Sequence, residues 1–273
     1  MNARELGRLV QGQLEAATIP EAAFEAEYLV RSVTGLDRAT YFAGPAVAGR
    51  ALAEVQGAVA RRLHREPAAY ITGTREFFGL AFAVTNAVLI PRPESELMVE
   101  AALAALGEHP RARVADIGTG SGCIAIAVAA NAPGARVTGI DRSASALRVA
   151  AMNARTHAAP VTFVQGDLLG PVGAADIVLA NLPYIPSGDI AGLQPEVRDW
   201  EPRVALDGGH DGLTVVRRLI RDCADRVRPR LLALEVGAGQ AAAVACLCTR
   251  AGAAVEVVPD LSGIERMVVA RWR

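Results

Sequence analysis

A glycine-rich segment, Asp116–Gly122 (DIGTGSG), is the first chemical signal in the sequence. The residue pattern predicts that a buried strand ends there and that a helix begins. Glycines let the backbone turn tightly at such a point and approach a ligand closely. The first amides of the following helix then face whatever binds above the sheet. The segment is therefore a candidate cofactor loop, and a purely structural turn is the alternative.

Two cofactors compete for this loop. Gly120-x-Gly122-x-x-Ala125 matches the dinucleotide fingerprint G-x-G-x-x-G/A only weakly. The pattern D/E-x-G-x-G-x-G, found in S-adenosylmethionine enzymes, matches Asp116–Gly122 at every position. In that interpretation Asp116 holds the methionine ammonium group, directly or through water. A dinucleotide enzyme has no obvious need for this carboxylate, so the loop favours S-adenosylmethionine.

Acidic residues are predicted to close the next two strands. Asp141 ends "VTGID" and can accept hydrogen bonds from both ribose hydroxyls of either cofactor. Asp167 ends "VQGD", and with Leu168 beside it suits an adenine, whose amine needs a polar partner and whose ring needs an apolar wall. Each aspartate alone could be a helix cap. Together with the glycine loop, they predict a ligand site at the carboxyl edge of a parallel sheet.

Asn181-Leu182-Pro183-Tyr184 follows the fourth apolar run of this region. A planar amide or aryl amine nitrogen is a poor nucleophile because its lone pair is delocalised. Two acceptors, the Asn181 side-chain oxygen and the Leu182 carbonyl, could bind its two N–H groups and turn the lone pair toward a sulfonium methyl group. Pro183 biases Leu182 to an extended conformation, and Tyr184 can stack on the planar group. The alternative is a turn that merely ends a strand.

The elements that must position these residues alternate between strand and helix after residue 93. The expected strands are 113–117, 136–140, 161–165, 176–180, 230–235, 254–258 and 265–271. The expected helices are 94–106, 122–131, 143–154, 211–227 and 239–250. This order predicts a parallel sheet covered on both faces. The last two strands lack a helix between them and should form an antiparallel edge.

The N-terminal part has a different pattern. Three amphipathic helical stretches are expected within 2–65, with Pro20 in the first turn of the second. Residues 77–84 read as a β-hairpin. We therefore expect a small helical domain at 1–68, a hairpin linker at 69–92 and a catalytic α/β domain at 93–273.

Composition argues against several classes of protein. The 273 residues carry a formal net charge of −1, without the basic surplus that nucleic-acid binders usually show. The four cysteines lack a disulfide framework, and no apolar run reaches membrane-spanning length. The four histidines have no metal-ligand spacing, and no metal is expected. A cytoplasmic location fits best.

Two segments give the sequence a specific family resemblance. Asn181–Tyr184 resembles the [N/D]-x-P-[Y/F] motif of amino-group methyltransferases, and Glu66–Glu96 resembles the linker region of the release-factor glutamine methyltransferases, the HemK-type family. That linker carries G-x-x-E-F-x-x-L-x-F and then L-I-P-R-P-x-x-E. Residues 202–218 are also similar to the family. The resemblance covers essentially the whole chain.

The resemblance implies a Rossmann-like class I S-adenosylmethionine-dependent methyltransferase. Its expected substrate is the glutamine of the Gly-Gly-Gln loop of class I peptide chain release factors, with the helical domain helping to dock the factor; neither a membrane nor sequence-specific nucleic-acid binding is expected. Arg92 and Glu94 lie in the linker motif. Two roles remain open for them: an ion pair that braces the linker, or a contact to the substrate. The substrate-holding residues are Asn181, Leu182, Pro183 and Tyr184. The cofactor-binding residues are Asp116, Gly118, Thr119, Gly120, Ser121, Gly122, Asp141, Asp167, Leu168 and Asn181.

One residue departs from the family pattern. The family usually has Asn-Pro-Pro-Tyr, whereas Leu182 occupies the second position here. Asn-Leu-Pro-Tyr is the form found in the adenine dimethyltransferases of ribosomal RNA. A nucleic-acid adenine N6-methyltransferase and a ribosomal-protein glutamine methyltransferase therefore remain alternatives. A non-catalytic cofactor-binding scaffold and a dinucleotide oxidoreductase are more distant ones, and the pairing of Asp116 with Asn181–Tyr184 opposes both.

Overall fold

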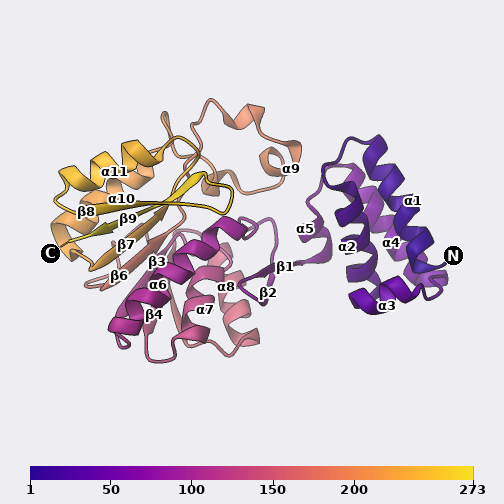
Figure 1. Cartoon of the computed structure of the whole chain (residues 1–273), viewed down its shortest axis with the longest axis horizontal. Coiled ribbons are helices and arrows are strands. Elements are labelled where there is room, and N and C mark those ends of the chain that lie inside the picture. The colour runs from indigo at the N-terminus through magenta and orange to yellow at the C-terminus, as the bar shows by residue number, and fades with distance from the viewer. Residues whose placement is uncertain (273) are drawn as a thin grey trace. The chain divides into compact units, whose positions relative to one another are not determined.

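The computed structural model describes residues 1–272, which divide into two compact units. The helical unit comprises Met1–Thr74 together with Gln194–Trp200, and the sheet unit comprises Arg75–Leu193 and the chain from Glu201 onward. The chain thus leaves the sheet unit at Gln194 and re-enters it at Glu201. Figure 1 labels the elements of both units. No helix within the described residues is long and apolar enough to cross a membrane.

The helical unit is built on amphipathic helices whose apolar stripes form one core. The first helix begins at a capping box, in which Asn2 and Glu5 each bond the other's backbone amide, and it buries Leu6, Val10 and Leu14. The helices are α1 (Ala3–Ala16), α2 (Ala22–Thr34), α3 (Arg38–Ala43), α4 (Gly49–Leu63), α5 (Ala68–Thr72) and α9 (Pro195–Arg198).

The helical unit differs from the sequence-based expectation in two respects. Pro20 does not lie in the first turn of the second helix, because Glu21 has a left-handed backbone (φ 52°) and α2 begins only at Ala22. The short helices α3, α5 and α9 were missed, since segments of four to six residues are too short to show helical periodicity.

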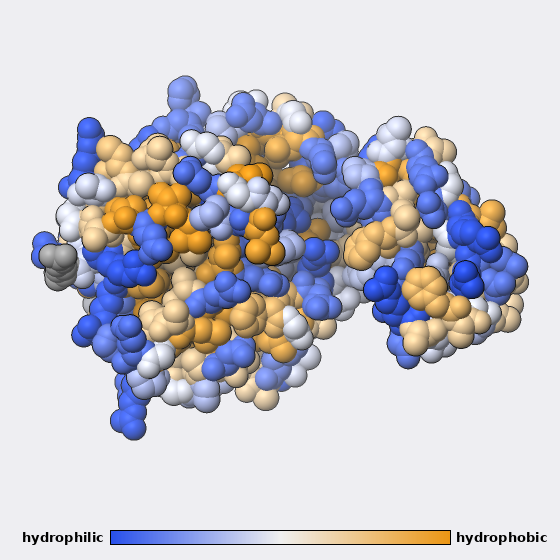
Figure 2. Space-filling model, in the orientation of Figure 1, coloured by the Kyte–Doolittle hydropathy of each residue, from blue (hydrophilic) through white to orange (hydrophobic). Residues whose placement is uncertain are grey.

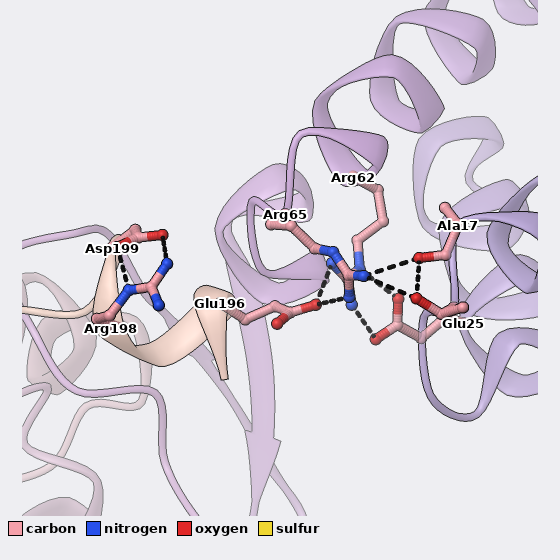
Figure 3. Close-up of polar contacts among 8 residues, drawn as sticks. Ala17, Glu25, Arg62, Arg65, Glu196, Arg198 and Asp199 are labelled. Carbon is pink, nitrogen blue, oxygen red and sulfur yellow. Dashed lines mark hydrogen bonds and ion pairs between the residues drawn. The ribbon is translucent and has the colours of Figure 1, made fainter. Parts of the chain in front are cut away.

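A buried arginine joins α9 to the rest of the helical unit (Figure 3). The Arg62 side chain is only 2% exposed, and its guanidinium pairs with Glu25 (Nε to Oε2, 2.5 Å) and with Glu196 (Nη1 to Oε1, 3.0 Å). Arg65 adds a second bond to Glu196 and one to the Ala17 carbonyl. A buried guanidinium requires such partners, since an unpaired charge there would be costly. These bonds explain why Gln194–Trp200 belongs to this unit.

The sheet unit contains a seven-stranded sheet in the order β5-β4-β3-β6-β7-β9-β8. The strands are β3 (Arg113–Ile117), β4 (Arg136–Asp141), β5 (Val161–Gln165), β6 (Ile177–Ala180), β7 (Leu231–Glu235), β8 (Ala254–Pro259) and β9 (Glu265–Arg271). The first five are parallel, and β9 pairs antiparallel with both β7 and β8. This architecture confirms the predicted doubly covered sheet with an antiparallel edge.

Helices cover both faces of this sheet (Figure 1). One core lies under α6 (Glu96–Glu108), α7 (Cys123–Asn131) and α8 (Ala144–Thr156), and the other lies under α10 (Thr214–Asp222) and α11 (Ala241–Arg250). The strands between them are apolar almost throughout, as strands buried on both faces must be. The unit also contains the short 3₁₀ helices η1 (Pro93–Ser95), η2 (Ile190–Gly192) and η3 (Arg203–Ala205), and the π-helix η4 (Cys223–Val227).

The order of strands reverses between β3 and β6. From β3 the chain proceeds through β4 to β5 on one side, and from β6 to β7 on the other. Ile117 and Ala180 are paired at the carboxyl ends of β3 and β6, so the residues that follow them, Gly118 and Asn181, are neighbours. Ligands of open α/β sheets bind at such a switch point. The glycine loop and the Asn181 segment therefore meet at one place.

The expected hairpin is present as β1 (Thr74–Phe77) and β2 (Leu80–Ala83). Phe78 and Gly79 form its turn, and both have positive φ, as a two-residue hairpin of type I′ requires. The buried Asn153 of α8 exchanges hydrogen bonds with Ala83 and also donates to the Ser121 carbonyl (2.9 Å). The end of β2 is thereby tied to the glycine loop.

Candidate active site

The glycine loop takes the conformation that its sequence predicts. Gly118, Gly120 and Gly122 all have positive φ, a region that other residues enter at a cost. The amides of Gly118 and Thr119 donate to the Ile140 carbonyl at the end of β4. A Cβ on Gly120 would meet nothing closer than 3.9 Å, so the space above this glycine is open. The loop can therefore bring its backbone against a ligand.

Asp116 lies beneath the loop. Its Oδ2 accepts hydrogen bonds from the Thr119 hydroxyl (2.6 Å) and the Ala125 amide (3.2 Å), which brace the loop against α7. Burial raises the pKa of this carboxyl to about 6. Its Oδ1 is buried and receives no hydrogen bond from the described residues. The carboxylate thus has a bracing role that the sequence did not suggest, and one acceptor left for a ligand group or a water.

Asp141 closes β4 as expected. Its carboxylate accepts from the Gly120 amide (Oδ2, 2.9 Å) and the Ser143 amide (Oδ1, 2.8 Å), and its remaining lone pairs are available to ribose hydroxyls.

Asp167 lies two residues beyond the end of β5, which ends at Gln165 as expected, and the Gly166 amide between them donates to the Asp141 carbonyl. The Asp167 carboxylate is 59% exposed and pairs with Arg218 of α10 (2.5 Å). Leu168 beside it is buried, with a positive φ. Both residues still line the same cleft as Gly120.

Asn181 begins the loop after β6, and its amide is held in one orientation. Its Nδ2 donates to the Ser95 hydroxyl (3.0 Å), and this hydroxyl is hydrogen-bonded in turn to the Glu235 carboxylate. No residue among 1–272 donates a hydrogen bond to the Asn181 side-chain oxygen or to the Leu182 carbonyl. The two acceptors expected to bind a planar nitrogen are thus both free.

The rest of this loop is anchored by residues 203–212 and by Gln240. Ile185 exchanges backbone bonds with Leu206 and Gly208, and Gln240 donates to the Tyr184 carbonyl (2.8 Å). A Cβ on Gly208 would lie 2.7 Å from the Pro183 carbonyl and 2.4 Å from the Gly212 carbonyl. A Cβ on Gly212 would likewise meet the Tyr184 carbonyl, so Gly208 and Gly212 of "LDGGHDG" are needed because the backbone of the Asn181 loop passes directly against them. Sequence reasoning noted this segment without finding that purpose.

The linker motif contributes an ion pair. Arg92 lines the cleft, and its Nη2 bonds Glu201 Oε1 at 2.5 Å. Glu201, only 5% exposed, also accepts from the Ile90 amide (3.3 Å), and burial raises the pKa of its carboxyl. The bracing role considered for Arg92 is therefore present, with Glu201 as its partner rather than Glu94.

One open cleft joins these residues, and its empty space of about 1060 Å³ includes the solvent at its mouth. All of its lining residues belong to the sheet unit. Most of the predicted site residues line it: Gly118, Thr119, Gly120, Ser121, Asp141, Asp167, Leu168, Asn181, Leu182 and Pro183. Asp116 lies beneath the loop, Gly122 ends the loop against Ile126 and Ala150, and the Tyr184 ring lies beside Gly237 rather than on the lining.

Three polar residues near the cleft were missed by sequence reasoning. Ser95, Glu201 and Glu235 are all buried, at 2%, 5% and 4% exposure. Glu235 offered a signal, because an acidic residue ends an otherwise apolar strand at the same edge as Asp141. Ser95 and Glu201 offered none, since their roles depend on contacts with residues more than 80 positions away.

The sheet order, the glycine loop and the Asn181 loop define a Rossmann-like methyltransferase. Residues 94–191 match the "Methyltransferase small domain" family, and residues 5–73 match the "PrmC N-terminal domain" family. Among solved structures, the hMettl16 catalytic domain in complex with an RNA hairpin is similar with a TM-score of 0.57 at 16% identity, covering 82% of both chains. A methyltransferase from Pyrococcus furiosus has a TM-score of 0.52 at 17% identity, covering 78% of this chain and 96% of its own. At these identities the likeness shows the fold alone.

Curated relatives are far more similar in sequence. The release factor glutamine methyltransferase of Geobacter sulfurreducens is 42% identical over 96% of this chain and 93% of its own length. The enzyme of the same name from Gloeobacter violaceus is 44% identical over 95% and 94%. The chain belongs to the release factor glutamine methyltransferase family.

Proposed function

We propose that this protein transfers a methyl group from S-adenosylmethionine to the side-chain amide nitrogen (N5) of the glutamine in the Gly-Gly-Gln motif of class I peptide chain release factors, in the cytoplasm. The observation that carries the proposal is the fixed Asn181 amide, whose oxygen is free beside the free Leu182 carbonyl at the edge of the cofactor cleft. The names of the relatives support the choice of substrate.

The cleft suits S-adenosylmethionine chemically. The open backbone at Gly120 accommodates close approach, Asp141 would hold the ribose hydroxyls, and Leu168 with Asp167 would contact the adenine. The unpartnered Oδ1 of Asp116 suits a cationic group, reached directly or through water. When bound, the cofactor supplies an electrophilic sulfonium methyl group and leaves as S-adenosylhomocysteine.

The residues of the Asn181 loop supply positioning rather than acid–base chemistry. The Asn181 Oδ1 and the Leu182 carbonyl accept the two N–H groups of the substrate amide, which turns its lone pair toward the methyl group. The methylated nitrogen then loses its extra proton to water, so no strong base is needed. Leu182 supplies the same carbonyl as the proline usual in the family.

The Tyr184 phenol does not act as a base. Burial raises its pKa to about 12, so the group stays protonated at neutral pH. Its main-chain carbonyl is fixed by Gln240.

Several features support a protein rather than a nucleic-acid substrate. The net charge is −1, and Leu9, Phe24 and Phe42 of the helical unit are about half exposed. Figure 2 shows apolar side chains interspersed with hydrophilic ones on the visible face. Such a mixed surface suits protein docking better than phosphate binding.

Labelling distinguishes the candidate substrates. The purified protein is incubated with methyl-labelled S-adenosylmethionine and, separately, with a recombinant class I release factor, the same factor carrying Gln→Ala in its Gly-Gly-Gln motif, ribosomal protein and ribosomal RNA. We expect label on the first alone. Label on the glutamine-free factor would refute the site of methylation, and label on RNA without label on the factor would favour the adenine methyltransferase suggested by Leu182.

Gly208→Ala should impair transfer without removing the cofactor site. The new Cβ would meet two backbone oxygens at 2.4 and 2.7 Å, which cannot yield as a side chain would, and the Asn181 loop must shift. A displacement of about 1 Å can cost roughly 100-fold in rate, so we expect kcat/KM to fall by about that factor. Gly173→Ala is the matched control, since nothing lies within 4 Å of its Cβ. Equal activity of the two variants would show that the contact does not position the loop.

A further inference from the structure

We propose that Ser95 and Glu235 are positioning residues that set the orientation of the Asn181 side-chain amide, so that its oxygen rather than its nitrogen faces the substrate. This inference rests on the proposed function for the nature of the substrate. The hydrogen-bond chain itself consists of Glu235 at the end of β7, Ser95 at the start of α6 and Asn181 after β6.

The direction of the chain follows from what each group can donate. An ionised carboxylate only accepts, so the Ser95 hydroxyl must donate its single proton to Glu235. The Ser95 oxygen can then only accept from Asn181, and an amide accepts through oxygen but donates through nitrogen. Asn181 must therefore present Nδ2 to Ser95, which leaves Oδ1 for the substrate. Without this chain, the two amide orientations are nearly equivalent in shape.

The Ser95 hydroxyl points toward Asn181 and Glu235, as the proposed role requires. Ser95 is the last residue of η1 and has a helical backbone (φ −68°, ψ −13°), and its side chain makes no capping bond to α6. Its hydroxyl is turned inward instead, 98% shielded from solvent, onto the two other members of the chain.

Glu235 is a carboxylate with no ion-pair partner among the described residues, and Ser95 is its only hydrogen-bond partner there. Burial raises the pKa of its carboxyl to about 7; the hydrogen bond from Ser95 opposes this shift, as do Arg266 and Arg92, and Glu94 adds to it. The other titratable groups that face it are the Tyr184 phenol and the Cys123 thiol, which are neutral at pH 7, and burial raises their pKa values further to about 12.

Protonation should release the constraint. A protonated Glu235 can donate to Ser95, whose own proton is then free to bond Asn181 Oδ1, and the amide can turn over. Since the folded carboxyl titrates near pH 7, the constraint is complete above that pH and is lost as pH falls through it. Transfer to glutamine should therefore decline on the acid side in the wild type.

Kinetics on the full-length protein test the chain. Ser95→Ala should lower kcat/KM for the release factor by about 10- to 100-fold, with the dissociation constant of S-adenosylmethionine changed less than about threefold. Ser95→Thr, which keeps the hydroxyl, should restore most of the activity. Ser95→Ala and Glu235→Gln should both lose the decline in kcat/KM between about pH 8 and pH 6 that the wild type shows. Equal kcat/KM for wild type and Ser95→Ala, or the same acid limb in all variants, would overturn the proposal.

A second readout does not depend on the substrate. In ¹⁵N-labelled wild type, one side-chain amide proton of Asn181 should be shifted downfield by its bond to Ser95 and should move with an apparent pKa near 7. Glu235→Gln should abolish that titration. If the wild type labels no release factor yet the signal behaves in this way, the proposed substrate fails and the positioning chain stands. An Asn181 signal that is independent of both pH and Glu235 refutes the chain, whether or not the factor is methylated.

Discussion

Asn181→Ala is expected to reduce methyl transfer by about 10³-fold or more while leaving the affinity for S-adenosylmethionine within about threefold. The alanine removes the free Oδ1, which the proposed mechanism uses to bind one N–H of the substrate amide. The Leu182 carbonyl would remain, and a nitrogen held by one acceptor rotates away from the methyl group. Single-turnover kinetics with a release factor, together with calorimetric titration of the cofactor, measure the two quantities separately.

Two further variants sharpen this test. Asn181→Asp keeps an acceptor toward the substrate but cannot donate to Ser95, so it should retain more activity than the alanine variant and less than the wild type. Asn86→Ala changes the same residue type at an exposed loop position and should behave as the wild type. Full activity of Asn181→Ala would show that the loop does not act by holding the amide.

Asp141→Ala is expected to weaken binding of S-adenosylmethionine by about 10²- to 10⁴-fold. Each hydrogen bond to a charged group contributes about 1.5–3 kcal/mol, and the proposed bidentate contact to ribose makes two of them. The variant also loses the acceptor for the Gly120 and Ser143 amides, which hold the glycine loop in shape. Isothermal titration with S-adenosylhomocysteine measures the loss without requiring turnover.

Asp167→Ala provides the comparison for Asp141. Its carboxylate is 59% exposed and already paired with Arg218, so the proposed contact to adenine competes with water and with an arginine. We expect its effect on cofactor affinity to be less than about tenfold. Equal losses from both aspartates would mean that Asp141 has no special role in holding the ribose.

The order of elements and the residues of the cofactor loop could be predicted from the sequence. Alternating apolar runs and helical periodicities place five parallel strands, because such strands must be apolar when both faces are covered. The three glycines of the loop predict a backbone with positive φ at their positions, since few other residues adopt it. The motif after β6 predicts its function from the residue types alone, because the Asn181 side chain offers an acceptor for an N–H group of a planar nitrogen.

The partners of these residues were decided only by the tertiary structure. Which strand lies beside which is set by packing, and the neighbouring positions of β3 and β6 bring Gly118 next to Asn181 across 63 residues of sequence. The orientation of the Asn181 amide depends on Ser95 and Glu235, from two other elements. Hydrogen bonds between distant positions leave no periodic trace in a sequence, so these two residues could not be assigned a role before the fold was known.

The place of the segment from Gln194 to Trp200 was likewise decided by the tertiary structure and not by the local sequence. Its sequence reads as an irregular loop, and the structure assigns it to the helical unit through Glu196 and the buried Arg62. An arginine in an amphipathic helix is ordinarily exposed, and nothing in its neighbours along the chain indicates burial. The residue types and their local order determined what chemistry this protein can perform, and the three-dimensional pairing of buried polar groups determined how that chemistry is held in place.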